Sequence, residues 1–99
     1  MPFSEAHKGV RKLRIYLYRQ LKLLRKGLVD EALFLFEPIE KTIIEISQEK
    51  IDDAISREIL IKCQEMNEEI LARLNIEKNG IARNLFRTEV ERKIREFLD

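Results

Sequence analysis

The stretch "KGVRKLRIYLYRQLKLLRKG", residues 8–27, carries eight lysines and arginines and no acidic residue. When successive residues are placed 100° apart, its apolar side chains form one narrow stripe and its basic side chains fall on the other side. The stripe consists of Val10, Leu13, Leu17, Leu21, Leu24 and Leu28. Gly27 follows two basic residues and is a common stop signal for a helix. The stretch therefore predicts an amphipathic helix over about residues 4–26.

A second apolar stripe at helical spacing covers residues 28–47. Its members are Val29, Ala32, Leu33, Phe36, Ile39, Ile43 and Ile46. Pro38 interrupts this segment, but the stripe keeps its register on both sides of the proline. We therefore expect a helix that is kinked at Pro38 and not broken there.

A third stripe covers residues 53–86 and predicts a long helix, which Asp52 and Asp53 can cap. It consists of Ile55, Ile59, Cys63, Met66, Ile70, Leu74, Ile81 and Leu85. The stripe passes through Gly80, which favours a weakened long helix over a hairpin at that point. The apolar face shifts at Phe86, and a short terminal helix is expected over residues 88–98.

Composition agrees with helices throughout the chain. Of the 99 residues, 37% are charged and 44% hydrophobic, with three Gly and two Pro. These values are typical of amphipathic helices and not of a turn-rich β fold. We expect an all-α fold with one domain over residues 1–99, an antiparallel three- to four-helix bundle with a long third helix. The surplus length of that helix must fold back as a fourth helix, dimerise, or lie across a binding groove.

The net charge of +1 conceals a strong asymmetry along the chain. Residues 8–26 contain eight basic residues and no acidic one, whereas residues 30–69 contain four basic and twelve acidic residues. Blocks of opposite sign on one small chain predict that the first helix lies beside the acidic middle.

Cys63 is the only cysteine, so no internal disulfide can form. The N-terminus lacks the apolar segment of a signal peptide, and the longest apolar run is five residues, far short of the roughly 20 that span a bilayer. We therefore expect a cytoplasmic protein without a membrane span.

Catalytic or metal chemistry finds little support in this sequence. His7 has no second histidine and no cysteine at ligand spacing, and Cys63 falls on an apolar stripe, where a small buried side chain is the usual explanation. No phosphate-binding glycine loop is present. We expect no catalytic residues, no metal, no cofactor and no enzymatic activity.

The basic side of the first helix offers a nucleic-acid face as an alternative. Eight cations could follow a phosphate backbone, but the acidic middle of the chain would repel a duplex, so nucleic-acid binding is the third choice. This alternative face consists of Lys8, Arg11, Lys12, Arg14, Arg19, Lys22, Arg25 and Lys26.

Several apolar residues lie off the stripes or at their edges, and they suggest a surface for a partner. The simplest explanation is that they widen the bundle core. The alternative is a groove for another protein's amphipathic helix, which would use anchors at i, i+3 and i+4. We assign Phe34, Leu35, Ile44, Leu60, Leu71 and Ile76, together with the stripe residue Leu74, to this hypothetical partner-binding surface.

Two stretches together resemble FliT-type flagellar export chaperones. They are "KGLVDEALFLFEPIEKTIIEI" at residues 26–46 and "ILIKCQEMNEEILARLNIEKNGIARNL" at residues 59–85. The chain differs from the family pattern at Val29, at Pro38 and after Leu85. The resemblance implies a cytoplasmic helical chaperone that binds the C-terminal helical region of the filament-cap protein FliD and prevents its premature assembly.

If the resemblance holds, the shift of the apolar face at Phe86 motivates the hypothesis that the C-terminal segment covers the client groove when no client is present. Deletion of residues 87–99 should then tighten client binding. A structural or regulatory coiled-coil homodimer is the second choice for the function. Client binding, concentration-dependent helicity and salt-dependent retention on nucleic acid distinguish the three alternatives.

Overall fold

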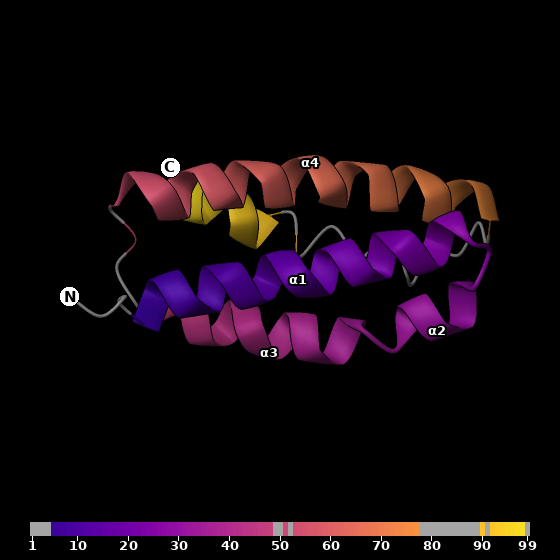
Figure 1. Ribbon diagram of the computed structural model, residues 1–99, viewed down its shortest axis with the longest axis horizontal. Coiled ribbons are helices and arrows are strands. Elements are labelled where there is room, and N and C mark those ends of the chain that lie inside the picture. The colour runs from indigo at the N-terminus through magenta and orange to yellow at the C-terminus, as the bar shows by residue number, and fades with distance from the viewer. Residues whose placement is uncertain (1–4, 49–50, 52, 78–89, 91, 99) are drawn as a thin grey trace.

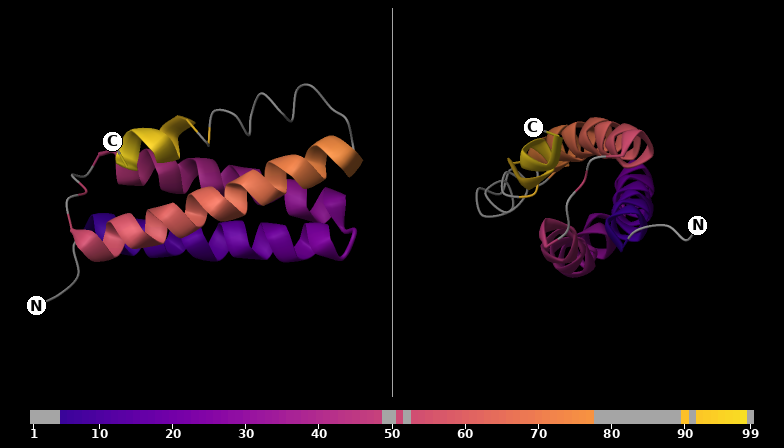
Figure 2. Two further views of the ribbon diagram at one scale, coloured as in Figure 1. Left: turned by 90° about the horizontal axis from the view of Figure 1, so that it is seen from above. Right: turned by 90° about the vertical axis from the view of Figure 1, so that its left-hand side faces the viewer.

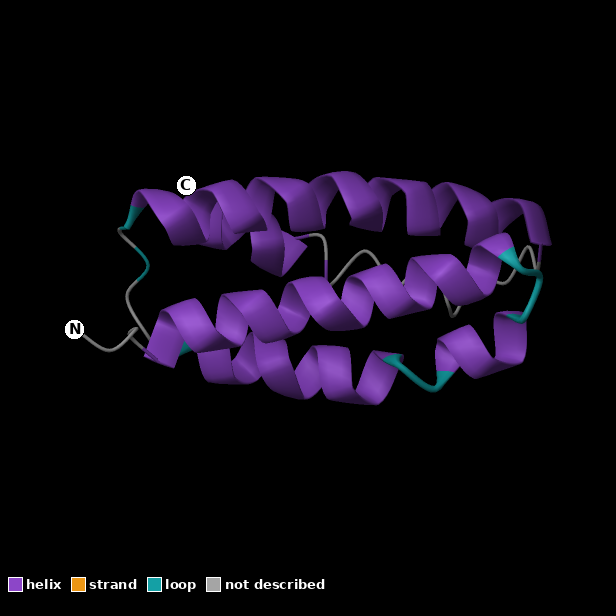
Figure 3. Ribbon diagram, in the orientation of Figure 1, coloured by secondary structure: helices purple, strands orange, loops and turns teal. Residues whose placement is uncertain are grey.

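The computed structural model describes residues 5–48, 51, 53–77, 90 and 92–98. Its four labelled helices are α1 (Glu5–Arg25), α2 (Val29–Leu33), α3 (Phe36–Ser47) and α4 (Ala54–Glu77) (Figure 1). Residues 92–98, called the C-terminal segment below, are also helical, and the described ranges contain no β-strand (Figure 3). The expected all-helical bundle is thus confirmed for this part of the chain.

Helix α1 is the centre of the arrangement. It contacts α2, α3 and α4, and it lies between α4 and α3 in Figure 1. Lys12 Nζ lies 3.3 Å from Glu45 Oε2 near the end of α3, and Gln20 Nε2 donates a 3.0 Å hydrogen bond to the Ala32 carbonyl in α2. The chain therefore returns along α1 after the turn at its end. The colour gradient in Figure 1 shows that α4 then runs in the same direction as α1.

The leucine stripe of α1 forms one wall of the core, as the sequence predicts. Burial of this stripe removes apolar surface from water and is the main force that holds α1 in place. The buried members are Val10, Leu13, Leu17, Leu21 and Leu24. Leu28 is exposed, so its assignment to the stripe is wrong.

The exposure of Leu28 follows from the way in which α1 ends. Gly27 has a φ of 80°, its N–H donates to the Leu24 carbonyl at 3.0 Å, and the Leu28 N–H donates to the Leu23 carbonyl at 2.9 Å. These bonds form a Schellman motif, in which a glycine in the left-handed region reverses the chain. Leu28 lies beyond this reversal and leaves the helical register of α1.

The segment after Gly27 forms two helices and not one kinked helix. A turn at Phe34 and Leu35 separates α2 from α3, and Pro38 is the third residue of α3 (Figure 1). Proline has no N–H, but N–H groups in the first helical turn have no intrahelical acceptor in any case. The expectation of a kink at Pro38 is therefore wrong, because the helix ends before the proline and starts again where the proline is tolerated.

Helix α4 starts at a cap that the sequence predicts. The Ser56 N–H donates a 2.8 Å hydrogen bond to Asp53 Oδ2, an N-cap contact that satisfies one orphan donor of the first turn. The stripe residues Ile59, Cys63 and Ile70 are buried, but Ile55 is exposed and its assignment to the stripe is wrong. The expected weakening at Gly80 and the apolar shift at Phe86 lie outside the described residues.

The C-terminal segment folds back against the bundle. Ile94 in this segment and Val90 before it are buried in the same core as α1, α3 and α4, and Phe97 packs partly against it. A guanidinium nitrogen of Arg57 at the start of α4 donates to the Leu98 carbonyl. In Figure 2 the segment, coloured yellow, and α1 lie on different sides of α4. The described residues after α4 thus pack on the shared core, whereas the surplus length expected for the third helix, up to residue 86, lies outside the described residues.

No helix in the described ranges has both the length and the apolar content that are needed to cross a membrane.

Candidate binding groove between α1 and α4

A groove of about 560 Å³ lies on the surface between α1 and α4. We call it the α1–α4 groove. Its walls are the outer sides of two helices that run in the same direction (Figure 1). The lining residues are Arg14, Ile15, Tyr18, Arg19, Lys22, Lys62, Glu65 and Met66.

The exposed surface of the groove is mostly apolar. Ile15 and Tyr18 are three residues apart on α1, so their side chains lie on one face of the helix. Their exposed fractions are 47% and 50%, which is high for large apolar side chains on a small chain with few residues to spare for its core. Met66 of α4 is half-buried and adds a flexible apolar side chain. The groove thus offers apolar area that the bundle itself does not cover.

Positive charge surrounds this apolar surface. Arg14, Arg19 and Lys22 come from α1, and Lys62 comes from α4. Glu65 alone is acidic among the eight lining residues, all of which the structure describes. Within the described ranges Arg14, Arg19 and Lys62 take part in no ion pair, so no carboxylate of this part of the chain neutralises their charges.

Lys22 and Tyr18 contact each other inside the groove. The ammonium nitrogen of Lys22 lies 5.5 Å from the centroid of the Tyr18 ring, within the range of a cation–π interaction. This contact places a charge over one face of the ring. The same face is therefore not open for stacking with another aromatic group.

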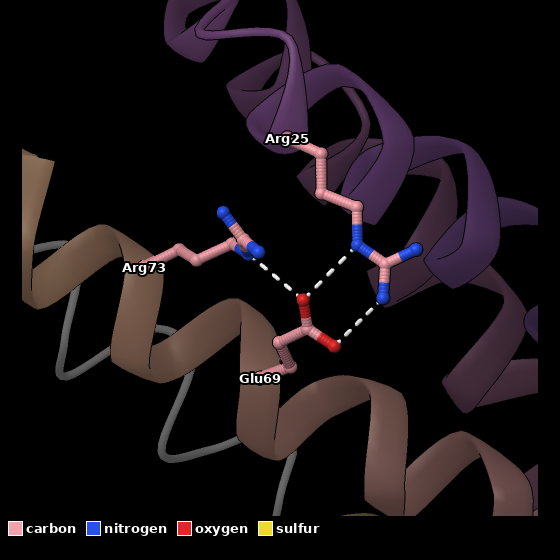
Figure 4. A network of polar contacts seen from close by, with 3 residues as sticks. All are labelled: Arg25, Glu69 and Arg73. Atoms are coloured by element: carbon pink, nitrogen blue, oxygen red, sulfur yellow. Dashed lines mark hydrogen bonds and ion pairs between the residues drawn. The ribbon is translucent and has the colours of Figure 1, made fainter.

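One turn beyond the groove, an ion-pair network joins α1 to α4 (Figure 4). Arg25 Nη2 lies 2.9 Å from Glu69 Oε1, and Arg25 Nε donates to Glu69 Oε2 at 3.1 Å. Arg73 Nε donates to the same Oε2 at 2.8 Å. Arg25 follows Lys22 by three residues and Glu69 follows Met66 by three, so the network closes this end of the groove.

The network shifts the pKa values of two of its members, Glu69 and Arg25. The hydrogen bonds from Arg25 and then from Arg73 lower the pKa of Glu69 to about 2. The hydrogen bond with Glu69 raises the pKa of Arg25 above its ordinary value. Glu69 and Arg25 are therefore both charged at neutral pH, and the bidentate contact between them fixes the separation of the two helices at this point.

Burial sets the chemical state of the thiol of Cys63. Cys63 is a buried free thiol on α4, and burial raises its pKa to about 12 against a smaller opposing effect of Arg14. The thiol is therefore protonated at neutral pH, and its assignment to the core is confirmed. Within the described ranges, no group of three or more His, Cys, Asp and Glu side chains is placed to hold a metal ion.

The partner-binding surface predicted from off-stripe residues is not a single surface in this structure. Leu60 and Leu74 are buried in the core, so their assignment to that surface is wrong and the simpler explanation, a wider core, holds for them. Leu35 and Leu71 are half-buried. The side chain of Ile76 lies outside the described part of the chain.

Among the members of that set whose side chains are described, Phe34 and Ile44 have large exposure, 79% and 53%. Phe34 lies in the turn between α2 and α3, and Ile44 lies on the outer side of α3. Neither residue lines the α1–α4 groove. They remain exposed apolar side chains on the opposite part of the bundle.

The eight cations of the predicted nucleic-acid face are divided by the fold. Lys12 pairs with Glu45 of α3, and Arg25 pairs with Glu69 of α4, which confirms that the basic helix lies beside acidic segments. Arg14, Arg19 and Lys22 line the groove. The basic face is therefore not one continuous strip, because acidic side chains of two neighbouring helices interrupt it.

Sequence reasoning missed Ile15, Lys62, Glu65 and Met66 as site residues. A signal was present at Ile15, which lies among basic residues on the side of α1 that faces away from the leucine stripe. A single apolar residue there is ordinary, but together with Tyr18 on the same side of the helix it forms an exposed apolar pair, the kind of patch that suggests a contact outside the core. The residues of α4 carry no such signal, because the spacing within one helix does not reveal which helix lies beside it.

No protein-family model matches the chain, and comparisons with curated proteins and with solved structures found no match either.

Proposed function

We propose that the chain is a protein-binding module that captures a helical segment of a client in the α1–α4 groove. The observation that carries the proposal is the groove itself, in which Ile15, Tyr18 and Met66 expose apolar surface between two helices. Capture would bury this surface reversibly, and the gain would come from removal of apolar area from water. The proposal includes an antiparallel bundle, in which the chain runs along α1, returns through α2 and α3, and runs forward again along α4. Helices α1 and α4 then point in the same direction and share an outer surface.

The resemblance to FliT-type export chaperones supports a more specific version of this proposal. In that version the chain acts in the cytoplasm as an export chaperone, and its client is the C-terminal helical region of the filament-cap protein FliD. Binding would keep an aggregation-prone or assembly-competent helix covered until export. The stretches that carry the resemblance, residues 26–46 and 59–85, include the α4 wall of the groove.

A capture experiment with matched variants tests the proposal. The purified chain is used as bait in a nuclease-treated lysate of the source organism, and bound proteins are identified by mass spectrometry. Ile15→Ser should reduce recovery of the client at least about fivefold, because a buried isoleucine contributes about 1.5–3 kcal/mol when it is covered. Ile44→Ser is the control, since it removes an isoleucine of similar exposure from α3.

Other results of the capture experiment would support a different site or a different function. The groove would be rejected if Ile15→Ser recovers as much client as the unsubstituted chain while Ile44→Ser or Phe34→Ser loses it. That result would place the binding site on the surface predicted from sequence. Partners that disappear after nuclease treatment would favour nucleic-acid binding. Recovery of the chain alone, with helicity that rises with concentration, would favour the coiled-coil homodimer.

A further inference from the structure

We infer that the α1–α4 groove is built for an acidic amphipathic helix, with the acidic flank of that helix along α1. This inference rests on the proposed function and adds the chemistry of the client. It follows from three properties of the groove: the backbone state of its walls, the length of its apolar surface and the distribution of its charges.

The walls favour a helical occupant over an extended one. Both walls are α-helices, whose backbone N–H and C=O groups are bonded within the helix. An extended peptide in such a groove would lose water from its backbone and find no backbone partner. A helix satisfies its own backbone groups, so it can bury one face without this cost.

The length of the groove sets the size of the contact. The lining residues of α1 run from Arg14 to Lys22, which corresponds to about 12 Å along a helix at roughly 1.5 Å per residue. This distance accommodates about two turns of a partner helix. Apolar anchors at i, i+4 and i+7 of the partner would lie over Ile15, Tyr18 and Met66.

The charges on the two walls of the groove determine which charges the flanks of the partner helix should carry. The α1 wall carries Arg14, Arg19 and Lys22 and no acid, whereas the α4 wall carries one cation, Lys62, and one acid, Glu65. Carboxylates on the α1 side of the partner therefore meet three cations, and the α4 side calls for a mixed or neutral flank. Complementary charge at the edge of an apolar contact adds selectivity and speeds association.

The same features disfavour a nucleic acid as the occupant. Ile15 and Met66 offer nothing to a phosphate backbone, and one face of the Tyr18 ring is already covered by the Lys22 ammonium. Beyond the groove, Glu69 neutralises Arg25 and Glu45 pairs with Lys12, so phosphates would meet acidic side chains on leaving the groove.

Designed peptides provide a direct test with the full chain. The first probe is a labelled 18-residue peptide with leucines at i, i+4, i+7 and i+11 and glutamates on one flank. The matched control peptide carries lysines in place of the glutamates. A single-stranded oligonucleotide of similar length is the third probe. Binding is measured by fluorescence anisotropy at low and high salt. We expect the acidic peptide to bind at least about tenfold more tightly than the basic peptide, and added salt to reduce this preference.

Charge-reversal variants separate the groove from the general charge of the chain. Arg19→Glu should weaken binding of the acidic peptide about tenfold, whereas Lys26→Glu, which changes the net charge equally outside the groove, should weaken it less than about twofold. Lys62→Glu on the α4 wall should have a smaller effect than Arg19→Glu, because the acidic flank lies along α1. Circular dichroism melts of each variant show whether the bundle is intact.

The inference is overturned if the basic peptide binds as well as the acidic one, or if Lys26→Glu weakens binding as much as Arg19→Glu. It is also overturned if the oligonucleotide binds more tightly than the acidic peptide and does not respond to Ile15→Ser. Its failure is distinct from failure of the proposed function. Client capture that depends on Ile15 but shows no acidic preference rejects the client chemistry alone, whereas loss of any dependence on Ile15 rejects the binding groove.

Discussion

At Gly9 the backbone of α1 and the side chain of Ile46 on α3 come close together. A Cβ atom at residue 9 would lie 2.8 Å from Ile46 Cγ1, and Ile46 is buried, so its inner carbon has little room to move. Glycine in a helix lowers stability by about 1 kcal/mol relative to alanine. The close packing of α1 against α3 that glycine allows offsets this loss.

Gly9→Ala should therefore lower the free energy of unfolding, although alanine is the better helix former. Forced overpacking typically costs about 1–3 kcal/mol, more than the gain of about 1 kcal/mol from helix propensity. In the background Ile46→Ala, which removes the obstructing carbons, the same Gly9→Ala change should become stabilising. Urea denaturation of the four proteins in this cycle measures the reversal. A stabilising effect in both backgrounds would show that the two helices have space to spare at this point.

At the scale of the elements, the Arg25–Glu69–Arg73 network is a polar connection between α1 and α4. Its carboxylate has a pKa of about 2 in the folded chain, below the ordinary value of about 4.3 for an unfolded chain. A lowered folded-state pKa means that the ionised group stabilises the fold above the unfolded pKa, and that this contribution is lost as the pH falls through about 4 towards 2. Because the groups are partly exposed, the contribution is modest and is screened by salt.

Glu69→Gln should accordingly destabilise the chain at pH 7, and the difference from the unsubstituted chain should shrink between about pH 5 and pH 2. The neighbouring Glu68→Gln is the control, because Glu68 is exposed and takes part in no ion pair within the described ranges. Unfolding followed at several pH values and two salt concentrations gives both curves. A difference for Glu69→Gln that does not vary with pH would mean that the carboxylate charge contributes nothing to the joining of α1 and α4.

Also at this scale, the elements divide into those that the sequence predicts and those that it does not. The stripe of α1 and its end at Gly27 follow from local chemistry, namely 3.6-residue periodicity and the left-handed backbone that glycine allows. The stripe of residues 28–47 keeps one register through the turn at Phe34 and Leu35, so periodicity alone did not reveal the break between α2 and α3. The first-turn tolerance of Pro38 was the local clue to a restart.

The groove was harder to predict than the helices because it depends on which helices are neighbours. Periodicity assigns each side chain to the core or to the surface of its own helix, and on that basis Ile15 and Lys62 are both surface residues. Only the parallel placement of α1 and α4 makes them two walls of one groove. Leu60 shows the converse, because it lies off the stripe of its own helix and is buried all the same.

For the molecule as a whole, the C-terminal segment completes a core that the four labelled helices share. Val90 and Ile94 are buried together with Leu13, Leu17 and Leu74, whereas no residue of the segment lines the α1–α4 groove. The hypothesis that this segment covers a client site, with tighter binding after deletion of residues 87–99, therefore concerns a different side of α4 and stays a prediction. For a chain of 99 residues, loss of one part of a single core weakens all of it.

Ile94→Ala should therefore destabilise the entire bundle and not just the end of the chain. Loss of a buried isoleucine side chain typically costs about 2–5 kcal/mol, a large share of the roughly 5–15 kcal/mol that stabilises a small domain. Ile44→Ala removes the same atoms from an exposed position on α3 and should cost less than about 0.5 kcal/mol. Denaturation followed by circular dichroism and by hydrogen exchange in α1 compares the two. If Ile94 shares one cooperative core with Leu13 and Leu17, its truncation must lower the protection of α1 against hydrogen exchange. Unchanged exchange in α1 would show that the C-terminal segment unfolds separately and does not stabilise the bundle.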